Sequence, residues 1–287
     1  MRAVSLVLAL TACTKASEPP QLCTRALAPV PYEGTVYLLV GPVQEGVAMA
    51  RLDLTSGCLK PIAPHVATES TNGRRVVTDD VSAFGTPVID EVIDDALHPI
   101  GDKPVFGTQP AISNDGRVAS VRFMAPGFRL SVWDPTTGKN TKLYSSSGDL
   151  IRPQWQDDGS ILVLRGDRVR TQLVKIDPRG TAHVLTPAPG MKWMDVSSRG
   201  LVDLTDVGST TTIYDLATGE RHVLHGWYAI GWDPTGRILV VAKKDGEFGF
   251  ATSPDFGSVS SVSSISPAFA IGAAWVDRPP SSSTTPT

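Results

Sequence analysis

The chain has 287 residues, of which 41% are hydrophobic and 19% are charged, and its formal net charge is −3. This composition is that of a globular protein with enough chain to bury a core, and it excludes the basic surface that a nucleic-acid-binding domain needs. The 26 glycines and 23 prolines, together with the lack of a long helical period, favour an all-β body of short strands joined by tight turns.

The N-terminus has the pattern of an export signal. Arg2 supplies a positive charge, and the apolar run over 3–10 is too short to span a bilayer. Leu10-Thr11-Ala12-Cys13 then resembles the lipobox of bacterial lipoproteins. The resemblance implies a signal peptide over 1–12, a diacylglycerol on Cys13 and a lipidated tether over 13–33. It also implies an exported protein that is lipid-anchored to the bacterial cell envelope, on the periplasmic or the cell-surface side. The alternative is a buried N-terminal strand.

Two further cysteines, Cys23 and Cys58, are 35 positions apart. In an exported protein such a pair is expected to form a disulfide, which would staple the tether to the first repeat. The alternative is two buried thiols.

A turn motif recurs about every forty residues from the tether onwards. It consists of an apolar residue, an aspartate and a turn with glycine or proline, as in Trp133-Asp134-Pro135-Thr136-Thr137-Gly138. We expect each carboxylate to fix its turn by accepting backbone N–H groups. The six aspartates, of which the second and the last lie in weaker copies, are Asp53, Asp94, Asp134, Asp177, Asp215 and Asp255.

A glycine turn precedes each of these motifs by 15 to 21 residues, beginning with Gly34 and Asn72-Gly73. Between the two markers lie short β-branched runs such as 161–164 and 238–241, which are typical of buried strands. Each unit therefore holds about four strands. Six such sheets can bury their faces only against one another, which predicts a six-bladed β-propeller of four-stranded antiparallel blades over 34–277.

The last β-rich segment, 270–277, repeats the beginning of a unit, and no complete unit follows it. We expect it to pair with the first blade, which has no convincing inner strand of its own, and so to close the ring. The segment 278–287 is a disordered tail by composition.

Two motifs relate the repeat to known propellers. Gly231-Trp232-Asp233-Pro234-Thr235-Gly236 and Ile112-Ser113-Asn114-Asp115-Gly116 resemble the inner-strand motif of TolB-type propellers, and 131–139 resembles the strand end of WD repeats. The resemblance covers roughly 34–277 and implies a fold. It does not imply an activity, because propellers host many.

No pattern in the chain indicates a metal site, a cofactor site or a catalytic nucleophile. His222 and His225 would lie on opposite faces of a strand, since side chains alternate there. The segments that lead into the inner strands offer aromatic and mixed-charge side chains instead, and from them we take six binding residues: His65, Phe106, Arg152, Trp193, Trp227 and Tyr228. The alternative is that these side chains only plug the central channel.

The sequence thus predicts a lipid-anchored, monomeric binding or scaffold module, which presents one face of the ring to a protein or glycan of the cell envelope. The alternative function is a propeller enzyme of hydrolase or lyase type with its active site in the central channel.

Overall fold

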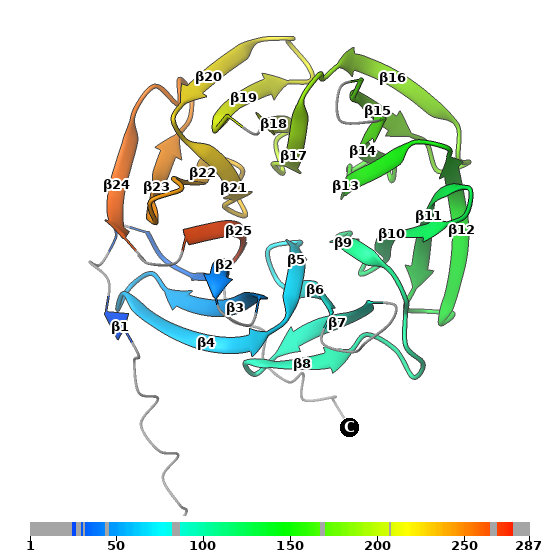
Figure 1. The fold of residues 1–287 in the computed structure, drawn as a ribbon, viewed down its shortest axis with the longest axis horizontal. Helices are drawn as coiled ribbons and strands as arrows, with labels where there is room; N and C mark the ends of the chain where they lie inside the picture. The colour runs from blue at the N-terminus through cyan, green and yellow to red at the C-terminus, as the bar shows by residue number, and fades with distance from the viewer. Residues whose placement is uncertain are drawn as a thin grey trace, which may run out of the picture.

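The computed structural model describes residues 25–26, 30, 32–43, 46–81, 87–166, 170–206, 208–264 and 269–277. Every regular element among them is a β-strand, and the strands form six antiparallel sheets around a central axis (Figure 1). The predicted all-β, six-bladed propeller is confirmed. No described segment forms a helix with the length and apolar character that a membrane crossing requires.

Each blade is numbered here in chain order. Blade 1 contains β1 (Arg25–Ala26), β2 (Thr35–Val43), β3 (Gly46–Asp53), β4 (Cys58–Pro64) and β25 (Phe269–Val276). Blade 2 contains β5 (Val66–Thr71), β6 (Val76–Asp80), β7 (Val88–Ile93) and β8 (Ala96–Pro99). Blade 3 contains β9 (Thr108–Ile112), β10 (Val118–Met124), β11 (Gly127–Asp134) and β12 (Lys139–Ser146). Blade 4 contains β13 (Asp149–Trp155), β14 (Ile161–Gly166), β15 (Gln172–Ile176) and β16 (Ala182–Pro187). Blade 5 contains β17 (Met191–Val196), β18 (Leu201–Asp206), β19 (Thr210–Asp215) and β20 (Arg221–His225). Blade 6 contains β21 (Tyr228–Trp232), β22 (Ile238–Ala242), β23 (Glu247–Thr252) and β24 (Val259–Ser264).

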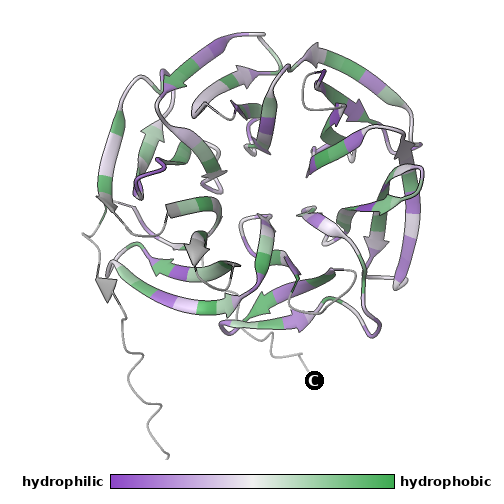
Figure 2. Ribbon diagram, in the orientation of Figure 1, coloured by the Kyte–Doolittle hydropathy of each residue, from purple (hydrophilic) through white to green (hydrophobic). Residues whose placement is uncertain are grey.

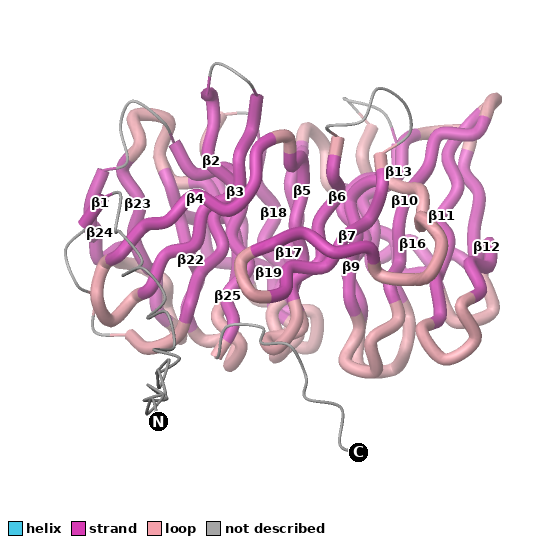
Figure 3. Tube along the Cα trace, turned by 90° about the horizontal axis from the view of Figure 1, so that it is seen from below, coloured by secondary structure: helices cyan, strands magenta, loops and turns pink. Residues whose placement is uncertain are grey.

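The innermost strands are β5, β9, β13, β17, β21 and β25 (Figure 1). Because the strands of a blade alternate in direction, the turn after each inner strand and the turn after each third strand lie on the same face of the ring. We call this the turn face, and the opposite face, where the chain crosses to the next blade, the crossover face. Figure 3 shows the ring from the side, with the strands running between these two faces.

The ring is closed by its last strand, as the sequence predicts. β25 pairs antiparallel with β2, from Thr35↔Val276 to Gly41↔Phe269. Trp275 strengthens this junction, because its Nε1 donates a hydrogen bond to the carbonyl of Glu33 at 3.2 Å and its ring packs edge-on against Phe250 of blade 6. Both ends of the described chain are therefore built into blade 1.

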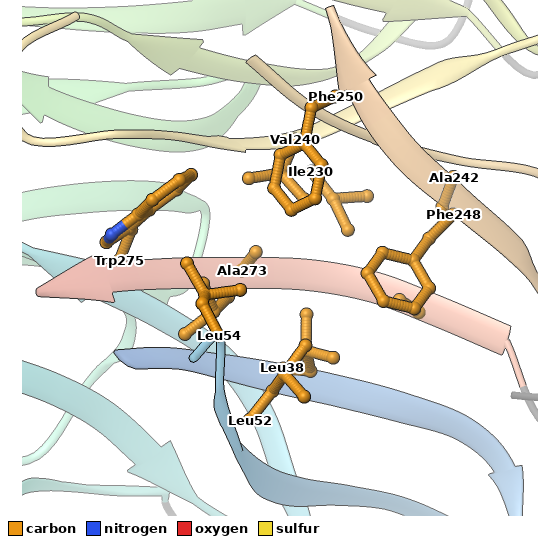
Figure 4. Packing of buried hydrophobic residues seen from close by; sticks show 12 residues of the cluster. Leu38, Leu52, Leu54, Ile230, Val240, Ala242, Phe248, Phe250, Ala273 and Trp275 are labelled. Carbon is orange, nitrogen blue, oxygen red and sulfur yellow. The ribbon is translucent and has the colours of Figure 1, made fainter. Parts of the chain in front are cut away.

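The core lies between neighbouring blades. The largest cluster joins blade 1 to blade 6 and includes Leu38, Leu52, Phe250, Ala273 and Trp275 (Figure 4). The run Ile161–Leu164 is fully buried, as expected for a strand covered on both faces. Figure 2 shows that hydrophobic and hydrophilic residues alternate along many of the strands, so each sheet directs apolar side chains toward its neighbours.

The repeated aspartates lie on the turn face. Asp134 accepts the N–H of Thr136 at 2.8 Å, and Gly138 closes the turn with a φ of +65°. The equivalent acceptors are Asp53 for Ser56 N (2.8 Å), Asp177 for Arg179 N (2.8 Å), Asp215 for Ala217 N (2.7 Å) and Asp255 for Gly257 N (3.4 Å). Asp94 differs, because it and Asp95 form a two-residue hairpin turn with φ of 50° and 61°, the backbone of a type I′ turn.

The start of blade 1 brings the N-terminal segment beside one of the cysteines. β1 pairs with β4, and this register places Ala26 opposite Cys58. Cys13, Cys23, the predicted signal peptide and the predicted tail over 278–287 lie outside the described residues. The lipid anchor and the disulfide therefore stay predictions.

Candidate functional site

A cavity of about 730 Å³ runs along the propeller axis. Its walls are the second halves of the inner strands, and its outer part is formed by the turns that follow them, such as 72–73, 113–115 and 197–200. The cavity therefore reaches the turn face.

Every inner strand carries a bulge where it pairs with the second strand of its blade. The pairing register shifts at 66–69 in β5, 151–154 in β13 and 191–193 in β17, and at matching places in β9, β21 and β25. A bulge redirects the side chains that flank it. In β13 the bulge contains Arg152, whose φ of 52° is rare for a residue with a side chain.

Arg152 and Trp193 meet inside the cavity. The guanidinium carbon of Arg152 lies 4.5 Å from the centre of the Trp193 ring, which is cation–π geometry. Arg152 is 8% exposed, whereas Trp193 is 37% exposed. Two of the six predicted binding residues thus form one stacked pair on the wall of the cavity.

Glu69 of β5 is the acidic neighbour of this pair. Its Oε1 lies 3.8 Å from Nη1 of Arg152, and its Oε2 is buried without a hydrogen-bond partner. Burial raises the pKa of Glu69 to about 8, an effect that Asp195 and Asp79 increase and Arg152 opposes. The side chain is only 5% exposed although it lines the cavity. Burying a carboxyl oxygen without a hydrogen-bond partner costs folding free energy, so the position of Glu69 points to a role other than stability.

Blade 5 contributes a second acidic pair. Asp195 of β17 and Asp203 of β18 are opposite each other in the ladder, and both line the cavity. Asp203 Oδ2 accepts the Nε1–H of Trp232 at 2.7 Å, and Asp195 Oδ1 accepts the N–H of Val196 at 2.8 Å. Burial raises the pKa of Asp195 to about 6. Burial, and then the charge of Asp195, also raise the pKa of Asp203.

Asp79 of β6 is a fourth buried carboxyl, but its role is structural. Oδ1 accepts the N–H and the hydroxyl of Thr68 at 2.6 and 2.8 Å, and Oδ2 accepts the N–H of Gln109 in the next blade at 3.2 Å. Burial nevertheless raises its pKa above the usual range. Asp79 therefore joins blade 2 to blade 3 behind the cavity wall.

The mouth of the cavity on the turn face carries both signs of charge. Arg117 stacks over Trp155 at 4.7 Å and pairs with Asp115 at 2.9 Å, and Lys175 pairs with Asp158 at 2.6 Å. All five residues line the cavity. Charged and aromatic groups of this kind suit contact with a polar partner.

The other four predicted binding residues do not line the cavity. They precede or begin inner strands at the crossover face, whereas the cavity occupies the opposite half of the ring. His65 is half-buried with a φ of 60°, and Phe106 is exposed beneath Arg122 at 5.8 Å. Trp227 is covered by Lys243 at 4.2 Å, and the Tyr228 hydroxyl donates to the carbonyl of Ala270 at 2.7 Å.

Two features of the sequence could have indicated Asp195 and Asp203, which the predicted set of binding residues left out. Asp203 interrupts the apolar run 201–204, and Asp195 follows an apolar stretch in an inner strand. A carboxylate in such a run must be satisfied or functional. Among the described residues, no group of three or more His, Cys, Asp or Glu side chains is arranged to hold a metal ion.

Comparisons with known proteins identify the fold. No protein-family profile and no curated protein sequence match the chain. Among solved structures, TolB from Acinetobacter baumannii superposes with a TM-score of 0.71 at 16% identity, covering 87% of this chain and 68% of that one. A chain of a nidogen/laminin complex gives 0.62 at 13% identity, covering 85% of this chain and 99% of that one. A putative TolB from Agrobacterium tumefaciens gives 0.50 at 18% identity, covering 90% and 85%. The expected likeness to TolB-type propellers is thus confirmed for the fold.

Proposed function

We propose that this protein is a binding module of the bacterial cell envelope, which presents the turn face and its axial cavity to a protein or glycan partner. The observation that carries the proposal is the cavity itself. It opens on one face of the ring and combines cation-stacked aromatic residues, Trp155 and Trp193, with paired charges at its mouth. Such a surface offers both apolar contact area and directional hydrogen bonds.

The neighbours in fold support a binding role. One of them is a chain from a complex of nidogen with laminin, so a propeller of this kind occurs in an assembly of two proteins. This chain shares only 13% identity with it. The partner here must therefore be found from the chemistry of this cavity.

The proposed location rests on the N-terminal sequence. Leu10-Thr11-Ala12-Cys13 would place a lipid on Cys13, and the two remaining cysteines suit an oxidising compartment. Intact mass spectrometry of the membrane-extracted protein tests this directly. A chain that starts at Cys13 and carries acyl groups supports the anchor, and an unmodified chain that starts at Met1 overturns it.

Binding is tested with the full-length protein, extracted in detergent and immobilised. Envelope extract and a glycan array are passed over the wild type, over Trp193→Ala at the cavity and over Val223→Ala. Val223 is the matched control, because it is 49% exposed on β20, the outer strand of the same blade. We expect a protein or glycan that both wild type and Val223→Ala retain and that Trp193→Ala loses.

Retention of nothing by the wild type would overturn the proposal, as would equal retention by Trp193→Ala. If the wild-type protein chemically altered a component of the extract, this would favour a second candidate function. This candidate is an enzyme of hydrolase or lyase type, and the observation that favours it is Asp195, whose pKa of about 6 suits proton transfer near neutral pH. Asp195→Asn should then abolish the reaction.

A further inference from the structure

We infer that the inner end of the cavity is a receptor for one organic cation, an ammonium or guanidinium group, neutralised by the carboxylates of Glu69 and Asp195. The inference rests on the proposed function, because it names the chemical class that the same cavity takes. It joins three observations on the described residues.

The first observation is the balance of charge. Glu69, Asp195 and Asp203 all interact electrostatically with Arg152, and among the described residues it is the cation that affects the pKa of each of them. If all three carboxyls were ionised, they would share one guanidinium in a setting that water does not fully screen, so without a ligand they keep protons instead. A bound cation would correct the imbalance, whereas an anionic ligand would increase it.

The second observation is the unpartnered oxygen. Glu69 Oε2 accepts no hydrogen bond, and the side chain of Glu69 is more than nine-tenths buried in the cavity wall. The ion pair with Arg152 is measured to the other oxygen, Oε1, at 3.8 Å, which is too long for a hydrogen bond. The carboxylate lies in the wall against Gly272, so a turn of this side chain toward the cavity is needed to bring Oε2 to a ligand. An N–H donor of the ligand would then supply the partner that Oε2 lacks, and a charged donor would do so most strongly.

The third observation is the aromatic wall. Trp193 is 37% exposed and holds Arg152 against its ring. The guanidinium thus stacks on Trp193 while it lies 3.8 Å from Glu69 Oε1. Trp193 also provides apolar surface for the carbon chain that carries the ligand's charge. The site therefore offers carboxylates for the charged group of the ligand and the Trp193 ring for its carbon chain.

The raised pKa values agree with this arrangement. Without a ligand, Glu69 with a pKa of about 8 holds its proton at neutral pH, and Asp195 with a pKa of about 6 is only partly protonated. A cation binds the ionised carboxylates, so binding must release protons and strengthen as the pH rises from 6 to 8.5. The charged groups that face Glu69 are Asp79, Arg152 and Asp195, and Asp203 acts through Asp195.

The test uses isothermal titration of the full-length protein with butylammonium and ethylguanidinium. Neutral 1-butanol and anionic butyrate, which share the four-carbon chain of butylammonium, are the ligand controls. At pH 8.5 we expect one saturable site for each cation and none for the two controls. Titration at pH 7 in two buffers that differ in ionisation enthalpy should show proton release.

Variants assign the site. Glu69→Gln keeps the shape of the side chain and removes the charge, and it should weaken cation binding at least tenfold at pH 8.5. Glu247→Gln is the matched control, because Glu247 pairs with Lys243 at 2.6 Å on the crossover face and does not line the cavity. It should bind like the wild type. Absence of cation binding by the wild type, equal binding of 1-butanol, or unchanged binding by Glu69→Gln would overturn the inference.

Two further comparisons complete the design. A short peptide with a C-terminal lysine amide that binds tenfold tighter than butylammonium would identify a protein as the source of the cation, and equal binding would identify a small amine. If the wild type binds no cation but still retains a partner that Trp193→Ala loses, the inference fails and the proposed function stands. If cations bind but no partner is retained, the proposed function fails alone.

Discussion

Gly272 of β25 lies directly against the carboxylate of Glu69 on the neighbouring inner strand, and a Cβ atom at position 272 would lie 2.6 Å from its Cδ. The absence of a side chain at 272 is thus what allows the carboxylate to lie in the wall between blade 1 and blade 2. Without that space the carboxylate would have to move into the cavity.

We predict that Gly272→Ala folds normally and weakens the burial of Glu69. The clashing atoms are the far end of a flexible side chain, which can swing away at low cost, so the free energy of unfolding should change by less than about 1 kcal/mol. The pKa of Glu69 should fall, because the displaced carboxylate is better hydrated.

Gly231→Ala is the contrasting variant for this prediction. A Cβ at 231 of β21 would meet the backbone carbonyl of Ala273, which cannot move without shifting the strand. It should cost roughly 1–3 kcal/mol or more. Urea denaturation measures both, and equal destabilisation by the two substitutions would contradict the account of Gly272.

We predict that the protein is more stable at pH 5.5 than at pH 8.5. The folded state raises the pKa of Asp195 to about 6 and of Glu69 to about 8, so it holds more protons than the unfolded chain between pH 4.5 and 8. The stabilisation is fully present below the unfolded pKa values and is lost as the pH rises through 6 and then 8. The loss between the two pH values should be roughly 3–4 kcal/mol, because each pH unit between the unfolded and the folded pKa is worth about 1.4 kcal/mol.

Denaturant titrations at several pH values measure this slope. Glu69→Gln should flatten its upper part, whereas Glu247→Gln should leave the slope unchanged, because its ion pair lowers the pKa of Glu247 and keeps that group ionised throughout. A slope of the opposite sign would show that the cavity carboxyls are ionised in the absence of ligand.

We predict that Asp177→Ala destabilises the propeller by about 1 kcal/mol. Oδ1 of Asp177 accepts the N–H groups of Arg179 and Thr181, both at 2.8 Å, and the substitution removes both bonds from an exposed turn. Asp255→Ala should cost less, since Asp255 makes one turn bond of 3.4 Å. Thermal unfolding compares them, and the reverse order would contradict the turn-fixing role.

We predict that Cys58 is linked to Cys23 and that breaking the link costs on the order of 3–4 kcal/mol, because it frees a loop of 35 residues in the unfolded chain. The pairing of Ala26 with Cys58 already brings the N-terminal segment to this place. Denaturation with and without reductant measures the cost. Alkylation of both thiols in the unreduced, unfolded protein would exclude the link.

The fold could be predicted from the sequence because a propeller is built from repeated units. Turn aspartates such as Asp134 and Asp177 mark the same place in successive blades, and their spacing alone sets the number of sheets. The closing strand was predictable for the same reason, since 270–277 starts a unit that the first blade lacks. Local chemistry repeated at a fixed interval was sufficient for both conclusions.

The site was only partly predictable. Arg152 and Trp193 were found because they lie near the beginnings of inner strands, but Glu69, Asp195 and Asp203 come from two blades on different sides of the axis. Whether a side chain there faces the axis depends on the bulges at 151–154 and 191–193. No residue type marks these bulges, so alternation along a strand could not place the carboxyls.

The junction of β2 with β25 also determines when this protein can fold. Trp275 donates its hydrogen bond to a carbonyl 242 positions earlier, whereas strands within the other five blades pair with near neighbours in sequence. The sheets of the other five blades can therefore form while a ribosome is still extending the chain. The ring itself can close only after β25 has been synthesised. Until then β2 presents a bare edge to which any other extended segment could add. A contact between segments so far apart in sequence forms slowly. While β2 is still unpaired, its edge can pair with a strand of another copy of the protein, so this is the stage at which misassembly is most favoured.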